Sequence, residues 1–184
     1  MSHSVWDQKL KDFLSSAASS EPTPGGGSVA GVVGALGMAL LVMSLEIVVA
    51  RADAKPEARD FLLQAKKKLE NLQKFADEDI EAYRRLMKAF SGPKDAKQIS
   101  NAAEASARVP LNAAKELVSG MALAQSAFNF VSGSIRADVL ASIIFMKAAL
   151  EVNLKNVDLN LPFIADESVK ASLAHDAKVL MASI

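Results

Sequence analysis

The feature that most constrains the fold is the segment 28–50, in which Glu46 is the only charged residue. About 20 apolar residues can cross a lipid bilayer as a helix. This segment, however, is rich in glycine and alanine, and no aromatic residues flank it, unlike a typical membrane span. Each glycine costs about 1 kcal/mol of helix propensity, which close packing against other helices can offset. We therefore expect a central Gly/Ala-rich helix that is buried all round in a bundle or a dimer.

The rest of the chain is expected to form helices that are separated by turns rich in glycine and proline. A first amphipathic helix is expected to begin at Ser4 and to run to Ala17, where the prolines and glycines of residues 19–27 end it. No segment alternates between apolar and polar residues as a strand does. We therefore expect an all-α fold, a single-domain bundle of six or seven helices spanning residues 1–184. The later helices are expected over residues 56–90, 95–108, 110–128, 135–154 and 168–181.

The composition excludes several kinds of chemistry. Lysine plus arginine equals aspartate plus glutamate at 21 each, so no net charge draws the chain to nucleic acid or to an anionic membrane. The absence of cysteine excludes thiolate nucleophiles and sulfur-ligated metals. The two histidines, His3 and His175, stand near opposite ends of the chain, which argues against a histidine-rich metal centre. The first ten residues lack the apolar core of a signal peptide, and we expect a cytoplasmic protein.

The loop from Pro22 to Ser28 is the first candidate for a binding site. It precedes a helix, whose N-terminus offers free N–H groups and partial positive charge, and glycine lets a ligand approach them. A dinucleotide-binding loop would need a preceding strand, and a Walker A loop would need a Lys-Ser/Thr pair after the glycines. The alternative is a tight turn with Ser28 as cap. Because three glycines exceed what a cap requires, we expect Pro24, Gly25, Gly26, Gly27 and Ser28 to bind an anion or a carbonyl.

Asp79 is the second candidate. It follows Phe61 by five helical turns, so it points along the apolar stripe of its helix. A buried, unpaired carboxylate is costly, and desolvation raises its pKa toward the range useful for proton transfer. Asp77 and Glu78 fall off this stripe and are expected in solvent. The alternative is a structural aspartate paired with an arginine or a helix terminus, and Glu46 poses the same question.

Three further polar residues are candidates for ligand contacts. Asp138, with Arg136 beside it, follows a Ser-Gly-Ser break, where an acidic residue also complements the dipole of the helix that begins there. Asn156 and Asn160 are four residues apart and share one helix face. Two amides on one face suit the amide edge of a pterin-like ligand, or they bond to neighbouring main chain.

Four blocks stand in order along almost the whole chain. They are Pro22-Thr23-Pro24-Gly25-Gly26-Gly27-Ser28-Val29, Asp79-Ile80-Glu81-Ala82-Tyr83, Ala107-Arg108-Val109-Pro110-Leu111 and Asn156-Val157-Asp158-Leu159-Asn160-Leu161. Together they resemble the formiminotetrahydrofolate cyclodeaminase/methenyltetrahydrofolate cyclohydrolase family. The proline-glycine block before a glycine/alanine helix is the most specific of the four.

The resemblance implies an all-helical homodimer that binds a folate substrate in a groove near the dimer contact, without a further cofactor. It implies that Asp79 is the catalytic carboxylate and that the loop, Asp138 and the two asparagines lie near the substrate. Two segments depart from the family pattern. Residues 131–138 keep only Asp138 where relatives carry several amides, and the basic segment that follows the glycine helix is reduced to residues 51–55.

Three functions remain open from the sequence. The leading hypothesis is a cyclodeaminase that converts 5-formiminotetrahydrofolate to 5,10-methenyltetrahydrofolate and releases ammonia. The second is a methenyltetrahydrofolate cyclohydrolase, in which water attacks the same carbon. The third, motivated by the altered 131–138 segment, is an inactive folate-binding or scaffold protein with the same fold.

Overall fold

The computed structural model describes residues 4–93 and 95–183, and over these residues the chain is helical and contains no strand. The all-α expectation is confirmed, with six α-helices in the described part of the chain. In chain order the elements are the 3-10 helix η1 (Val5–Asp7), α1 (Leu10–Ala17), α2 (Gly26–Val49), α3 (Glu57–Ser91), α4 (Ala96–Ala127), α5 (Ile135–Asn160), the 3-10 helix η2 (Leu161–Phe163) and α6 (Glu167–Met181).

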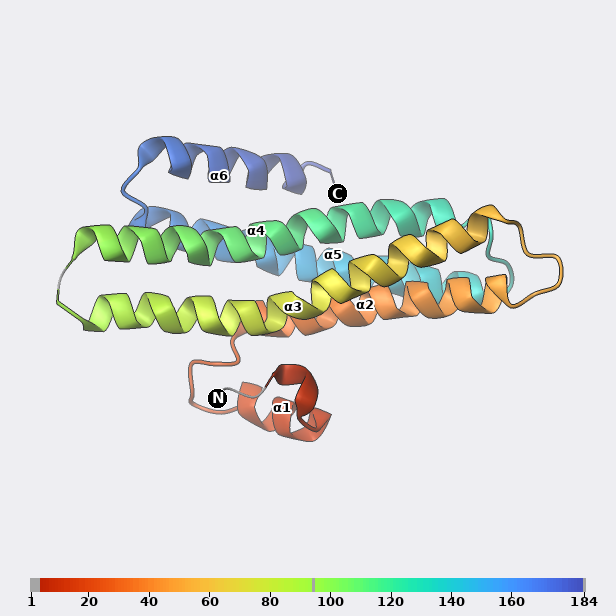
Figure 1. Ribbon diagram of the computed structural model, residues 1–184, viewed down its shortest axis with the longest axis horizontal. Helices are drawn as coiled ribbons and strands as arrows, with labels where there is room; N and C mark the ends of the chain where they lie inside the picture. The colour runs from red at the N-terminus through yellow and green to blue at the C-terminus, as the bar shows by residue number, and fades with distance from the viewer. Residues whose placement is uncertain (1–3, 94, 184) are drawn as a thin grey trace.

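Helices α2 to α5 form an elongated four-helix bundle (Figure 1). Each of them packs against two neighbours, in the pairs α2 with α3, α3 with α4, α4 with α5, and α5 with α2. Helix α6 lies along α4 and α5, whereas α1 stands outside the bundle, beside the start of α2 (Figure 1). The four long helices therefore form the body of the fold, and the shorter helices lie on its surface.

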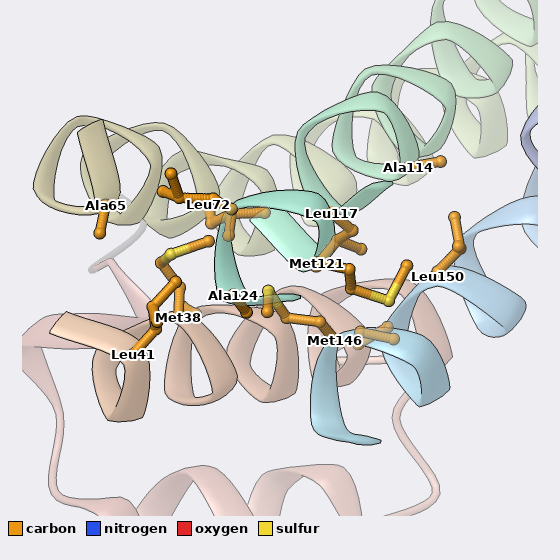
Figure 2. Close-up of a cluster of buried hydrophobic side chains, with 14 of the residues drawn as sticks. Met38, Leu41, Ala65, Leu72, Ala114, Leu117, Met121, Ala124, Met146 and Leu150 are labelled. Carbon is orange, nitrogen blue, oxygen red and sulfur yellow. The ribbon is translucent and has the colours of Figure 1, made fainter. Parts of the chain in front are cut away.

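The core lies along the bundle axis and is made of leucine, methionine and alanine. Figure 2 shows Met38 and Leu41 of α2 facing Leu72 of α3, Leu117 of α4 and Met146 of α5. Small residues let the helices approach closely. A Cβ atom placed on Gly31 would lie 2.9 Å from the backbone nitrogen of Ala76, so α2 and α3 are in near main-chain contact there. The glycines of α2 thus permit the close packing expected from the sequence.

Helix α2 is buried on its inner side only. It is long and apolar enough to cross a membrane by length and composition, yet 44% of its most apolar stretch is buried within the chain. On its outer side Leu36, Met43 and Ile47 are 54%, 40% and 42% exposed. The single chain therefore buries the inner side of α2 and leaves an apolar stripe uncovered, so burial all round, which was expected in a bundle or a dimer, would require a second chain.

Two helix boundaries differ from those expected. The helices anticipated over 95–108 and 110–128 form one continuous helix, α4, with Pro110 fully buried in its interior. The helix expected over 135–154 continues to Asn160. A proline usually breaks a helix because it removes one hydrogen bond and crowds the carbonyl four residues before it. Here α4 is buried in the core on both sides of the proline, at Ala107 before it and at Leu111 after it.

The N-terminal segment is two short helices rather than one. Ser4 caps η1 by accepting a hydrogen bond from the backbone N–H of Trp6, and Lys9 is extended before α1 begins. Asp77, expected in solvent, accepts hydrogen bonds from the Ser4 hydroxyl and from the backbone N–H of Val5. These two hydrogen bonds hold the start of the described chain against α3. They compete with the single helix from Ser4 to Ala17 that local spacing favours.

Glu46 has a structural role at the surface. Its carboxylate lies 2.5 Å from the ammonium group of Lys66 on α3, and both side chains are about half exposed. Exposed ion pairs of this kind contribute less than about 1 kcal/mol. Glu46 is therefore not a candidate for proton transfer.

Candidate active site

A cavity of about 300 Å³ opens between the loop before α2, the second half of α3, the first half of α4 and the end of α5. Its lining includes six of the residues expected from the sequence, namely Gly25, Gly26, Gly27, Asp79, Asn156 and Asn160. These residues come from three separate sequence blocks. The fold therefore brings the proline-glycine loop, the aspartate and the two amides to one place.

The loop lines the cavity with its glycines. Gly25 is the N-cap residue of α2, and its carbonyl accepts hydrogen bonds from the Val29 N–H and from the Ser28 hydroxyl. Ser28 is completely buried behind the loop, and neither it nor Pro24 is among the residues that line the cavity. The cap is thus Gly25, whereas Ser28 holds the first turn of α2 from behind.

Asp79 lies against the first turn of α2. A Cβ atom on Gly27 would overlap the Asp79 carboxyl group, so only glycine leaves room for the side chain. Burial raises the pKa of Asp79 above its ordinary value of 3.8, and the nearby polar groups of Ser28 at the start of α2 oppose this rise. The structural alternative is thus partly correct, because Asp79 does meet a helix terminus. The same carboxyl group also faces the cavity, where a raised pKa suits it to give and take a proton.

Asn160, which lines the same cavity as Asp79, has a defined orientation. Its side-chain Nδ2 donates to the backbone carbonyl of Asn156 at 2.8 Å and to that of Ser106 at 3.3 Å. Both asparagines are partly buried, and they line the cavity from one face of α5, as their spacing predicts. They therefore present amide groups to whatever the cavity binds.

Outside the loop, two polar residues of the cavity wall, Tyr83 and Ser106, were not predicted as site residues. Tyr83 lies one helical turn after Asp79 on α3, so the spacing of four residues was a signal for it. Ser106 on α4 donates its hydroxyl hydrogen to the Ala82 carbonyl at 3.2 Å, which ties α4 to α3 at the cavity wall. Nothing in the local sequence distinguishes Ser106 from other buried serines.

Asp138 lies away from this cavity. It occupies the first turn of α5, 18 residues before Asn156, which places it about 27 Å along the helix. There it complements the helix dipole, and the guanidinium of Arg136 lies 4.8 Å from the ring centre of Phe128. Within one chain, the structure does not bring Asp138 together with Asp79.

The match to a known family rests on residues 9–179, which fit the model of the formiminotransferase-cyclodeaminase family. The chain belongs to this family. It is 26% identical to a methenyltetrahydrofolate cyclohydrolase of Methylorubrum extorquens over 96% of this chain and 90% of that protein. The crystal structure of a formiminotetrahydrofolate cyclodeaminase from Thermotoga maritima superposes with a TM-score of 0.90 and 26% identity, covering 97% of this chain and 91% of the other.

The segments that depart from the family pattern lie at the opposite end of the bundle. Arg51, Lys55, Asn129 and Ser132 line a second cavity of about 200 Å³, beside the end of α2 and the start of α5. Among the described residues, which exclude His3, no three histidine, aspartate or glutamate side chains form a group that could hold a metal ion. That the protein works without metal or cofactor stays a prediction.

Proposed function

We propose that the protein is a folate one-carbon enzyme that closes 5-formiminotetrahydrofolate to 5,10-methenyltetrahydrofolate and releases ammonia. The observation that carries the proposal is the setting of Asp79. It supplies the one carboxylate among the described residues of the cavity wall, its pKa is raised by burial, and it lines the same cavity as two amides. Membership of the family supports the same substrate class.

The proposed reaction requires one group that first accepts and then donates a proton. The formimino nitrogen is protonated; N10 of the folate attacks the formimino carbon, and a bond forms between N10 and that carbon. The Asp79 carboxylate takes the proton that N10 loses and delivers it to the amino group on the same carbon. The carbon–nitrogen bond to that amino group then breaks, ammonia leaves, and the positive charge remains on the methenyl bridge. A carboxyl group with a raised pKa serves both steps.

The size of the cavity limits what it can hold. A volume of about 300 Å³ is at the lower end for small-molecule sites, so we assign it to the pterin ring and the one-carbon unit, with the rest of the folate outside. Gly25 to Gly27 let the ligand approach the N-terminus of α2. The amides of Asn156 and Asn160 pair with the polar edge of the pterin.

The second candidate function is methenyltetrahydrofolate cyclohydrolase, which the likeness to the Methylorubrum extorquens protein favours. In this reaction water forms a bond to the methenyl carbon, and Asp79 takes one of its protons and delivers it to N5. The bond between that carbon and N5 then breaks, the oxygen becomes the carbonyl of the 10-formyl group, and its second proton leaves to solvent. Both reactions pass through a tetrahedral carbon between N5 and N10. The same residues therefore serve either one, and the attacking and leaving groups differ.

The test is to incubate the purified protein with each folate and to follow methenyl absorbance. A rise with 5-formiminotetrahydrofolate, together with released ammonia, supports the cyclodeaminase. A fall with 5,10-methenyltetrahydrofolate above the uncatalysed rate supports the cyclohydrolase. The Asp79→Asn variant is the matched control for contaminating activity. If the wild-type protein and this variant are equally inactive with both folates, the proposal is wrong and the protein is a binding or scaffold member of the family.

We also propose that the protein is a homodimer formed through the uncovered apolar face of α2 and α5. This face carries Leu36, Met43 and Ile47 of α2 and Leu140, Ile144, Phe145 and Val152 of α5, each at least 40% exposed. The two stripes flank one seam, because a Cβ on Gly37 of α2 would lie 3.1 Å from the Cβ of Phe145. Monomeric proteins rarely expose contiguous apolar patches of this kind, and a second copy offers a face of the same character.

Light scattering at micromolar concentration tests the dimer. We expect twice the chain mass for the wild-type protein and the single-chain mass for Ile144→Asp. The variant Val179→Asp, at an exposed position on α6, is the control and should remain dimeric. A monomeric wild-type protein, or one that sediments with lipid vesicles, would refute the proposed occupant of this face.

A further inference from the structure

Pro110 lies inside α4, one helical turn after a residue of the cavity wall. Proline has no backbone N–H, and in a helix its ring crowds the carbonyl four residues earlier. In α4 that carbonyl belongs to Ser106, a residue of the cavity wall. Buried main-chain carbonyls are nearly always hydrogen-bonded. The proline therefore leaves a main-chain acceptor free at the edge of the site.

Asn160 supplies the missing donor. Its Nδ2 donates to the Ser106 carbonyl at 3.3 Å and to the Asn156 carbonyl at 2.8 Å. A side-chain amide has two N–H donors, and here both are used. The atom of the amide that remains to bind a ligand is Oδ1, which can only accept a hydrogen bond.

Asn153, one further asparagine on α5, provides an internal comparison. Its Nδ2 donates to the Ala149 carbonyl at 2.8 Å, which is the same bond to the residue four earlier that Asn160 makes with Asn156. The second bond, to another helix, distinguishes Asn160. With an ordinary residue at position 110, the N–H of that residue would bond to the Ser106 carbonyl. Asn160 would then keep one main-chain partner, and its amide would turn more freely.

We propose that Pro110 is a positioning residue that fixes the amide of Asn160, so that Oδ1 accepts an N–H group of the bound ligand. The site then selects ligands that present an N–H donor edge and rejects those that present a carbonyl or carboxylate at this point. The identity of the ligand as a folate rests on the proposed function. The orientation of the amide does not.

The experiment compares Pro110→Ala and Pro110→Val with the wild-type protein. Both variants restore the N–H, and valine fills most of the buried volume of the proline, so the test survives if the alanine variant folds poorly. Pro93→Ala, in the exposed loop between α3 and α4, is the matched control. The readouts are the ¹⁵N side-chain amide signals, with that of Asn160 identified by its loss in Asn160→Ala, and the affinity for 5-formyltetrahydrofolate by calorimetric titration.

We expect the Asn160 amide signal to move in both Pro110 variants and to stay unchanged in Pro93→Ala. Affinity should fall several-fold to about tenfold in the Pro110 variants, the value of about one hydrogen bond. In the Asn160→Ala background the proline change should have no further effect. An unmoved amide signal, or an equal loss of affinity in that background, would overturn the proposal. If the wild-type protein binds no folate, the proposed function fails, and the amide signal alone decides the role of Pro110.

Discussion

Replacing Asp79 by asparagine keeps the shape of the side chain and removes the group that gives and takes the proton. Two effects on stability oppose each other in the native protein. Burial penalises the ionised carboxylate, whereas Ser28 and the positive end of α2 favour it, the helix end by about 0.3–1 kcal/mol. Burial is the larger effect, since the pKa of Asp79 is raised. The ionised form therefore destabilises the fold relative to the neutral form.

The sign of the pH dependence follows from this direction. A carboxyl group whose pKa is higher in the folded chain binds its proton more tightly there, so stability falls as pH rises from 3.8 through the raised pKa. Each pKa unit corresponds to about 1.36 kcal/mol. We expect Asp79→Asn to match the wild-type stability below this window and to equal or exceed it at neutral pH. Turnover should fall by about 10²–10⁴.

The assay is urea unfolding followed by circular dichroism across this pH range, with turnover expressed per folded molecule. Glu46→Gln is the matched control, because that carboxylate is half exposed and distant from the cavity wall; it should leave turnover and its pH dependence unchanged. A variant at position 79 that loses about 1–3 kcal/mol at neutral pH, with turnover per folded molecule intact, would show that Asp79 is structural only.

Three further variants test the surroundings of the site. Gly27→Ala puts a methyl group into the space of the Asp79 carboxyl group. Because a catalytic group displaced by about 1 Å can lose a large part of its rate enhancement, turnover should fall at least about tenfold. Full turnover would contradict the contact. In Gly26→Val the new Cβ meets Val152 at 3.9 Å, so circular dichroism should be unchanged while folate affinity falls, and an unchanged Kd would make the loop only a turn. Asp77→Ala removes the hydrogen bonds that hold the N-terminal segment to α3, so trypsin should cleave before α2 faster than in the wild-type protein. An equal rate of cleavage would show that these bonds do not hold the segment in place.

The parts of the fold that could be predicted from the sequence depend on local spacing. The helix of the apolar segment α2 follows from its composition, and the position of Asp79 on the stripe of α3 follows from helical periodicity; both are found in the structure. The continuity of α4 could not be predicted in this way. The Ser106 carbonyl, which Pro110 leaves without its helical partner, accepts a hydrogen bond from Asn160, 54 residues after Ser106 in the chain. No local pattern reveals such a bond.

The N-terminal segment shows the same limit. Helical spacing favours one helix from Ser4 onward, but Asp77 holds Ser4 and Val5 from more than 70 residues away. In the candidate site, the glycines, Asp79 and the asparagines could be predicted because their residue types are unusual at their positions. Ser106 could not, because its contribution depends on which helix faces it.

The apolar inner side of α2 also has a consequence for synthesis. The ribosome releases α2 before α5, one of the two helices that cover its inner side, which begins roughly 90 residues later. At about 5–20 residues per second, the most apolar segment of the chain waits several seconds for its partner. The unfinished chain therefore exposes more apolar surface than the finished one and is more prone to aggregate. Slowing translation between residues 50 and 135 should lower the soluble yield, whereas the same delay after residue 160 should not.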